Sequence, residues 1–329
     1  MLSEREERIL DAVIRTYVET AEPAGSRTVA KRFGLGVSAA TIRNAMADLE
    51  EKGFLFHPHT SAGRVPTDLA YRYYVNTLMQ PVRIAASDQR LIRRELSEDR
   101  GNALDRLIHR AAQAIGLVTG ELGLAISPKL AEVVLEKLDL VSLSSEKVLL
   151  VMTLRNGLIR TVYVDLPSSV PPEALDSVNQ ILNERLAGQT LANIRLTLPE
   201  RLRDASSAPE ASELLNIFMQ SAEDAFELRE GAGDGVMLGR TSVIANQPEF
   251  ADEAKLKRLI ELTEERELLS RVLEGRDHDR TPTITIGVEH QLPQLAPFTL
   301  VTSEYRLGNV SGVIGVIGPT RMPYEKVAA

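Results

Sequence analysis

The 329-residue sequence contains no cysteine and no tryptophan, and only 4% of its residues are aromatic. Without cysteine, the chain cannot form disulfides, thiolate metal sites or a cysteine nucleophile. So few rings leave little for base-stacking recognition of single-stranded nucleic acid. No stretch approaches the roughly 18 apolar residues of a membrane span, and the N-terminus lacks the basic start and apolar run of a signal peptide. We therefore expect a soluble, cytoplasmic protein with no membrane partner.

The charge of the chain is unevenly distributed. The formal net charge is −8, but residues 1–80 hold ten basic and ten acidic residues, so the remainder carries the whole excess. Residues 23–47 and 52–67 contain several Lys and Arg side chains and no acid. Such an asymmetry indicates a candidate surface for an anionic partner. The alternative is that Asp and Glu are absent from these two segments by chance. The length and an apolar content of 43% predict a folded chain of about two domains, or three small ones.

Two short helices are predicted at the start of the chain. Ser3 and Glu6 have the spacing of a capping box, and apolar residues at helical spacing follow. This first helix should stop before Pro23. Ser26 is expected to cap a second helix that ends at Gly34.

A third helix and a hairpin complete this region. Ser38 is expected to cap a helix that ends at Gly53, and its buried face comprises Ile42, Ala45, Met46 and Leu49. Residues 54–57 and 64–65 read as two short strands around a turn-rich loop, and Thr67 or Asp68 then caps a further helix. The order helix, helix, turn, helix, hairpin is typical of a winged helix-turn-helix that binds double-stranded DNA.

In such a unit the second helix of the pair enters the major groove with its N-terminal residues first. Small side chains at this tip permit close approach, Asn44 could pair with adenine, and Arg43 with guanine or phosphate. Helix N-termini also present backbone N–H groups to phosphate, and Arg64 on the wing could reach the backbone or the minor groove. The predicted DNA-binding residues are Ser26, Arg27, Thr28, Ser38, Ala39, Ala40, Thr41, Arg43, Asn44 and Arg64.

Beyond residue 80 the pattern predicts a mixed α+β domain with a helical insertion. Residues 87–98 read as a charged helical connector and residues 104–117 as an amphipathic helix. Helices are expected at 171–187, 206–229 and 249–274. Strands are expected at 121–127, 135–143, 147–154, 158–164, 283–287, 299–303 and 310–317, with Asn156 and Gly157 in a tight turn.

The predicted helix 249–274 could belong to the core, to a dimer interface or to both. Its apolar pairs do not form a sustained heptad repeat, so they do not indicate a coiled coil. Helix-turn-helix proteins usually dimerise to read a two-fold operator, which favours the interface. The candidate interface residues are Leu256, Leu259, Ile260, Leu269 and Val272.

The sequence gives little indication of a cofactor site, a metal site or a catalytic site. Residues 34–39 match the loose pattern of a dinucleotide-binding loop, but a helix precedes them where that motif needs a strand. His57 and His59 could be half of a metal site, yet His109, His278 and His290 are distant in sequence, so a surface wing is favoured. No nucleophile elbow or phosphate loop is present. We expect no catalytic residue, no metal and no cofactor, and therefore no enzyme.

Several segments resemble one family, the heat-inducible transcription repressors called HrcA. The long motif SAATIRNAMADLE at 38–50 and the wing motif at 60–68 are the most specific. The other similar segments are residues 3–10, 23–28, 71–75, 247–250 and 318–324. The resemblance implies a dimeric repressor of chaperone operons that binds an inverted-repeat operator, and dependence on a GroEL-type chaperonin.

The resemblance also implies an N-terminal winged helix, a GAF-like domain and an inserted dimerisation domain. With the predicted elements, this gives a winged helix at 1–80, the GAF-like domain at 81–166 and 281–329, and the inserted domain at 167–280. The favoured function is a DNA-binding repressor released on heat stress. The alternative is a ligand-sensing winged-helix regulator whose GAF-like domain binds a small molecule.

Overall fold

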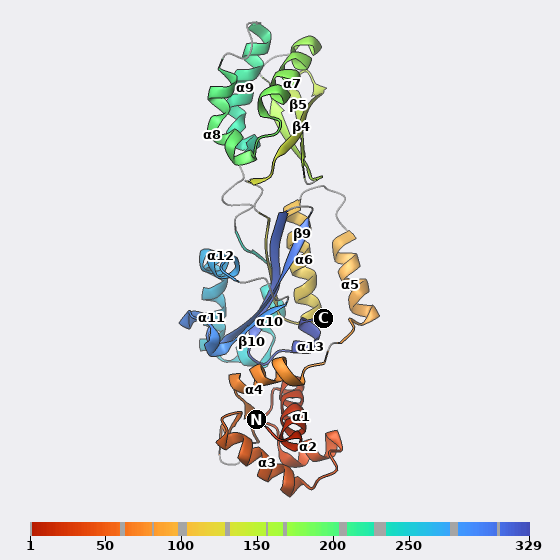
Figure 1. The fold of residues 1–329 in the computed structure, drawn as a ribbon, viewed down its shortest axis with the longest axis vertical. Helices are drawn as coiled ribbons and strands as arrows, with labels where there is room; N and C mark the ends of the chain where they lie inside the picture. Colours follow the sequence, from red (N-terminus) through yellow and green to blue (C-terminus); the bar gives the residue numbers. More distant parts are fainter. Residues whose placement is uncertain are drawn as a thin grey trace.

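The computed structural model is elongated, with three units arranged end to end (Figure 1). Within the described ranges, no helix has both the length and the apolar character that a membrane crossing requires. The structure describes residues 2–59, 63–80, 82–97, 104–128, 132–155, 157–166, 170–203, 209–226, 235–276, 282–307 and 310–329.

The N-terminal unit begins with three helices, α1 (Glu4–Thr20), α2 (Ser26–Phe33) and α3 (Ala39–Glu51). The predicted capping box opens α1. The Ser3 amide donates to Glu6 Oε2 over 2.8 Å, and the Glu6 amide donates to Ser3 Oγ over 3.4 Å. The helix ends before Pro23 as expected, because proline cannot continue the backbone hydrogen bonding.

A two-stranded antiparallel hairpin, β1 (Leu55–Phe56) and β2 (Val65–Pro66), follows α3. Thr67 caps the next helix, α4 (Asp68–Tyr73), which continues as the π-helical turn η1 (Tyr74–Leu78). The predicted hairpin and cap are thus confirmed, while Thr60 and the two residues after it lie outside the described residues.

The predicted cap of α2 is wrong. Gly25, not Ser26, is the N-cap, and Ser26 is the first helical residue and is buried. The reason is a contact across the unit, in which Ala24 and Arg64 exchange two backbone hydrogen bonds of 2.8 and 3.0 Å. This pairing fixes the entry of the chain into α2. Gly63 lies so close to Ala24 that a Cβ atom there would overlap its carbonyl group.

The central unit is a five-stranded antiparallel sheet with the order β7-β3-β10-β9-β8. Leu122, Leu124 and Ile126 point from β3 into one apolar core, while Ala125 points to the opposite face. The strands are β3 (Leu122–Ile126), β7 (Met237–Leu238), β8 (Thr283–Ile286), β9 (Phe298–Leu307) and β10 (Val310–Pro319).

Helices cover both faces of this sheet (Figure 1). One face packs against α6 (Leu104–Thr119), which in turn contacts the connector helix α5 (Ala86–Ser97). The other face packs against α11 (Glu253–Glu264) and α12 (Arg266–Glu274). The remaining short elements of this unit are α10 (Thr241–Ala245), η3 (Pro248–Ala251), η4 (Gly287–Glu289), η5 (Pro293–Leu295) and α13 (Tyr324–Val327).

The third unit is inserted between β3 and β7 and has its own apolar core. Its sheet is a meander of β4 (Leu135–Ser144), β5 (Lys147–Leu154) and β6 (Ile159–Asp165). One face of this sheet packs against α7 (Pro172–Leu186), α8 (Leu191–Leu202) and α9 (Pro209–Phe226). The predicted hairpin between β5 and β6 is confirmed, although Asn156 of its turn lies outside the described residues.

The packing groups the chain differently from the borders expected at 166 and 280. The strands of 135–165 belong with the helices of 172–226, and the helices of 241–274 belong with the five-stranded sheet. The amphipathic patterns identified most of these elements, though not α8 or α10, but did not specify which apolar faces meet. Sequence order alone therefore placed the insertion about forty residues too late, since the chain leaves the sheet after Ile126 and returns at Met237.

The predicted helix 249–274 is three elements, because the chain bends after Ala251 and again at Glu265. Leu259 and Leu269 are fully buried against the five-stranded sheet, so this chain's own core covers them and they are not an interface. Leu256 and Val272 pack at the edge of the same core, and Ile260 is exposed.

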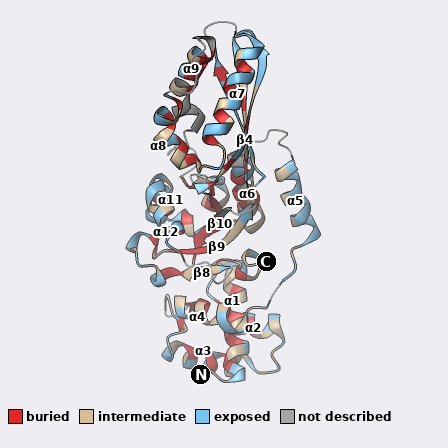
Figure 2. Cartoon of the chain, turned by 45° about the horizontal axis from the view of Figure 1, so that its top comes forward, coloured by how far each residue is buried: buried red, intermediate tan, exposed pale blue. Residues whose placement is uncertain are grey.

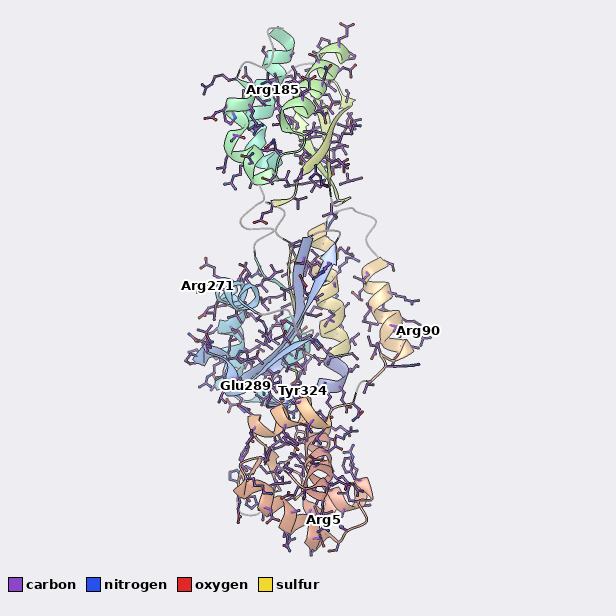
Figure 3. The ribbon with its side chains drawn as sticks, viewed as in Figure 1. Arg5, Arg90, Arg185, Arg271, Glu289 and Tyr324 are labelled. Carbon is purple, nitrogen blue, oxygen red and sulfur yellow. The ribbon has the colours of Figure 1, made fainter. Side chains whose placement is uncertain are left out.

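The N-terminal unit and the sheet unit share one core, in which Ile286, Val301 and Met322 pack with the helices of the N-terminal unit. Figure 3 shows Glu289 and Tyr324 at this junction. The DNA-binding candidate helices are therefore joined to the sheet through buried side chains.

Candidate nucleic-acid interface

The helices α2 and α3 lie at the free end of the molecule, away from the sheet unit (Figure 1). Gly34 ends α2 with a φ of 55°, a left-handed conformation that glycine adopts without strain. A short turn then leads into α3, whose buried face is the predicted set Ile42, Ala45, Met46 and Leu49. Because this face is fixed in the core, the opposite face of α3 is turned outward.

Ser38 caps α3 as predicted. Its hydroxyl accepts a 3.1 Å hydrogen bond from the Thr41 amide and lies 3.0 Å from the Thr41 hydroxyl. This places both hydroxyls at the N-terminal tip of α3, beside backbone N–H groups that have no partner inside the helix. A phosphate or a base edge at this tip would meet hydrogen-bond donors and the positive end of the helix dipole.

The outward face of α3 presents side chains suited to a DNA groove. Ala40, Arg43 and Asn44 are exposed there, and Ala39 is partly exposed. Figure 2 shows the exposed and buried faces of this end of the molecule. Ala40 adds no bulk, whereas Arg43 and Asn44 carry the donors that pair with guanine and adenine edges.

Several exposed cations of this end are unpaired by the residues that the structure describes. Arg27, Lys31 and Arg43 form no ion pair with any described residue, so their charges face solvent. Arg32 differs, because it pairs with Glu19 of α1. Thr28 is exposed beside Arg27 on the first turn of α2.

Two predicted DNA-binding residues are not available. Ser26 is buried, so its hydroxyl cannot reach a phosphate. Arg64 pairs with Glu50 of α3 over 2.7 Å, and its side chain is only 17% exposed. The hairpin therefore turns Arg64 inward, where it ties the wing strand to α3. Hairpin spacing predicted the strand but could not reveal this partner.

Arg5 is a basic residue at this end that the motifs did not indicate. It is exposed on the first turn of α1, and Figure 3 shows it near the free end of the molecule. Nearby Lys52 is paired instead, with its ammonium 2.6 Å from Glu6, which lowers the pKa of Glu6 to about 2. Glu4, Glu6 and Glu7 flank Arg5 in the sequence, so Arg5 does not belong to the acid-free segments that indicated an anionic partner.

Two sequence motifs 72 residues apart in the chain meet at the other side of the N-terminal unit. Arg321 pairs with Glu249 and donates a 2.5 Å hydrogen bond to the Val18 carbonyl oxygen of α1. The pair is about 85% buried, and the Arg321 guanidinium lowers the pKa of Glu249 against the effect of burial. Sequence alone showed both motifs but not that they touch.

A second ion pair fixes α4 on the sheet unit. Arg72 binds Glu289 through two hydrogen bonds of 2.6 and 2.5 Å and donates a third, of 2.7 Å, to the Ile284 carbonyl oxygen. The Asp68 carboxylate accepts from the Val288 amide at 3.0 Å. These contacts give the DNA-binding candidate surface a fixed orientation relative to the sheet.

No metal site is visible in the part of the chain that the structure describes, where no three His, Asp or Glu side chains gather in a ligating cluster. His57 and His59 lie on the hairpin, and His278 lies outside the described residues. The geometry at this end offers hydrogen-bond donors and positive charge, which suit binding rather than bond cleavage.

Comparison with known proteins extends over nearly the whole chain. Residues 105–328 match the family model described as "HrcA protein C terminal domain". Three curated relatives are each named "Heat-inducible transcription repressor HrcA". The relative from Chlorobium phaeobacteroides is 38% identical over 99% of this chain and 94% of its own. The relative from Chlorobium phaeovibrioides is 36% identical, over 98% and 93%. The relative from Pelotomaculum thermopropionicum is 34% identical, over 100% and 93%.

One solved structure has the same overall fold. It is titled "Crystal structure of a hypothetical protein at 2.2 A resolution" and superposes with a TM-score of 0.72. The alignment covers 99% of this chain and 94% of that chain at 18% sequence identity, so it speaks to the fold alone.

Proposed function

Starting from the HrcA family of heat-inducible transcription repressors, to which this chain belongs, we propose that α3 reads an inverted-repeat operator upstream of chaperone genes. The chain is a heat-shock transcription repressor. The finer proposal concerns how it binds: residues 2–80 act as a winged helix, with β1 and β2 as the wing. We propose a regulatory and not a catalytic role, in the cytoplasm, where operator DNA is found.

One observation carries this proposal. At the free end of the molecule, the exposed sides of α2 and α3 present Arg27, Lys31, Arg43 and Asn44, and the three cations form no ion pair with any described residue. The proposed major-groove contacts are Ser38, Ala39, Ala40, Thr41, Arg43 and Asn44. The proposed phosphate contacts are Arg27, Thr28, Lys31 and Arg5.

We further propose that the repressor is a homodimer joined through the inserted unit. No described helix covers the outer face of its three-stranded sheet, where Val141, Leu149 and Tyr163 form an apolar row across the three strands between the ion pairs Lys137–Asp139 and Lys147–Asp165. Ile159 and Leu143 are also exposed on these strands. A second copy is the occupant that a two-fold operator requires, since each half-site needs one reading head.

The remaining central unit, residues 104–126 and 235–329, is proposed to be the GAF-like domain. For the heat response, we propose that a GroEL-type chaperonin keeps the repressor in its DNA-binding form. A fold of ordinary marginal stability supports this idea, because a fraction of such molecules unfolds readily on heating and a chaperonin that promotes their refolding restores the active form. Operator binding measured after heating, with and without chaperonin, tests this dependence.

The deciding experiment is a fluorescence-anisotropy titration of the full chain on an inverted-repeat duplex from upstream of a chaperonin operon. A duplex of equal length with scrambled half-sites is the control, and both are measured at two salt concentrations. We expect operator affinity at least about a thousandfold above that for the scrambled duplex. Affinity should fall steeply with salt, because added salt makes the release of counterions on binding less favourable. Equal affinity for both duplexes, with folded dimer present, would overturn the proposal.

A further inference from the structure

A cavity of about 750 Å³ lies beside the junction of the N-terminal unit and the sheet unit, under the connector helix α5. Its walls come from α1, α5, α6 and the C-terminal segment that includes α13. The volume lies within the range of small-molecule sites. The helices α2 and α3 do not line this cavity, so it is separate from the proposed DNA surface.

The lining residues follow the helices, which makes the cavity an elongated slot. Asp88, Ile92 and Leu96 line it from successive turns of α5, while Ile115 and Val118 line it from α6. The two helices lie side by side (Figure 1 and Figure 2). At a rise of 1.5 Å per residue, the stripe on α5 is about 12 Å long. A slot of this shape fits a linear molecule better than a compact ring.

The walls of the slot are mainly aliphatic, and their side chains are accessible. Ile84, Ile92 and Leu96 on one side, and Ile115 and Val118 on the other, are each partly exposed. In addition, α5 has no fully buried residue. A bound hydrocarbon would therefore remove from water apolar surface that the folded chain leaves exposed, and such burial favours binding.

The polar groups inside the slot already have partners. The Thr119 hydroxyl donates to the Ile115 carbonyl oxygen over 2.8 Å, and the Tyr74 hydroxyl donates to the Glu325 carboxylate over 2.9 Å. Among the described residues, the buried polar side-chain atoms that lack a hydrogen bond all belong to residues outside this wall. An occupant that forms no hydrogen bonds in the slot, such as a hydrocarbon tail, leaves none of these groups unsatisfied.

One charged side chain of the wall is uncommitted. Arg83 is exposed and forms no ion pair with any described residue. The other charged side chains of the wall are paired: Arg15 with Asp11 and Glu325, Asp88 with Lys326, and Glu19 with Arg32. The free side-chain charge at the rim of the slot is thus positive, and it can bind a carboxylate.

We propose that this slot binds a linear fatty acid. The hydrocarbon tail lies between α5 and α6, and the carboxylate meets Arg83 at the exposed rim. Because α1 also contributes to the wall, the bound molecule contacts both the N-terminal unit and the sheet unit. Any effect on operator affinity rests on the proposed function, whereas the site itself does not.

The test uses isothermal titration of the full chain with monomeric dodecanoate, without DNA. We expect saturable binding at one site per chain. Ile92→Gln should weaken binding about tenfold, because a polar group then replaces apolar surface in the slot. Leu91→Gln is the matched control, because Leu91 is also partly exposed on α5 but does not line the slot. Ala111→Phe fills the slot from α6 and should abolish binding without lowering the thermal midpoint.

Variation of the ligand tests both parts of the fatty acid. Octanoate has a shorter tail and should bind at least about thirtyfold more weakly, since each buried methylene strengthens binding about fourfold. The neutral dodecanol should bind several-fold more weakly than dodecanoate, and Arg83→Gln should remove this difference. Arg90→Gln should preserve the difference, because Arg90 lies on α5 outside the slot (Figure 3).

Three results would contradict the proposal. Absence of saturable dodecanoate binding by folded protein, or unchanged affinity in both Ile92→Gln and Ala111→Phe, would overturn the site. Dodecanol binding as tightly as dodecanoate would overturn the carboxylate contact with Arg83. None of these measurements depends on DNA, so a failure of operator binding would be recognised separately.

Discussion

The guanidinium of Arg321 joins the carboxylate of Glu249 to the last turn of α1, because the same group also donates to the Val18 carbonyl oxygen. Glu249 precedes the helices on one face of the sheet, and Arg321 follows its central strand. The contact therefore holds the N-terminal unit in a fixed position relative to the sheet unit. The parallel contact of Arg72 with Glu289 does the same for α4.

Replacing Arg321 should destabilise the protein strongly. Arg321→Gln leaves the largely buried Glu249 without its partner, and we expect a loss of about 2–4 kcal/mol in the free energy of unfolding, measured by urea denaturation. The double variant Arg321→Gln and Glu249→Gln should recover part of this loss, since no charge is left unpaired. An additive double variant would show that the two side chains are not coupled.

Arg43 should contribute to operator recognition. We expect Arg43→Ala to cost about 1–3 kcal/mol at the operator and to relax specificity at one base position, measured by anisotropy on operator and single-substitution duplexes. Arg32→Ala is the matched control. Because Arg32 pairs with Glu19, its substitution should reduce operator affinity less than Arg43→Ala does. Equal losses on operator and scrambled DNA would make Arg43 a phosphate contact.

Glu121 should make stability fall as pH rises. Burial raises its pKa from 4.5 to about 8, although the Gln247 hydrogen bond and Arg321 oppose this effect. Between these values the folded state holds a proton that the unfolded state releases, so unfolding becomes easier with increasing pH. Between pH 5.5 and 8 the wild type should lose about 2–3 kcal/mol more than Glu121→Gln, measured by urea denaturation at both pH values. Parallel pH profiles for the two proteins would refute this.

Close packing of α6 on β3 should make Gly123 sensitive to substitution. A Cβ atom at this position would overlap the Ala112 carbonyl group of α6, so Gly123→Ala should cost about 2–3 kcal/mol. Gly235→Ala is the control, because open space surrounds that position and its backbone has ordinary φ. Similar thermal midpoints for both variants would show that α6 can shift freely.

The proposed dimer face can be tested by placing charge on it. Tyr163→Asp should shift the full chain toward monomer in analytical ultracentrifugation, because an exposed apolar sheet face would lose its fit to a second copy. Val288→Asp carries the same charge change at an exposed residue of the sheet unit and should leave the association unchanged. Monomer in the wild type, or no effect of Tyr163→Asp, would exclude this face.

Local signals predicted the N-terminal unit well. The Ser3 and Ser38 caps, the stop before Pro23, the left-handed Gly34 and the apolar face of α3 all depend on neighbours within one or two turns. For the same reason, the exposure of Arg43 and Asn44 could be read from helical periodicity. Ser26 was misassigned because a distant backbone pairing, between Ala24 and Arg64, sets the start of α2.

By itself, the sequence determined most of the segments that form helices and strands, where most of these start and end, and that residues 23–47 and 52–67 lack acid. Those properties arise from backbone geometry and local side-chain hydrogen bonds. Only the tertiary structure decided which apolar faces meet, and so placed β4–β6 with α7–α9, buried Leu259 and Leu269, and turned Arg64 inward. The hydrophobic effect is non-directional, so the apolar pattern of a sequence does not specify which distant residues pack together. Only the folded chain shows those contacts.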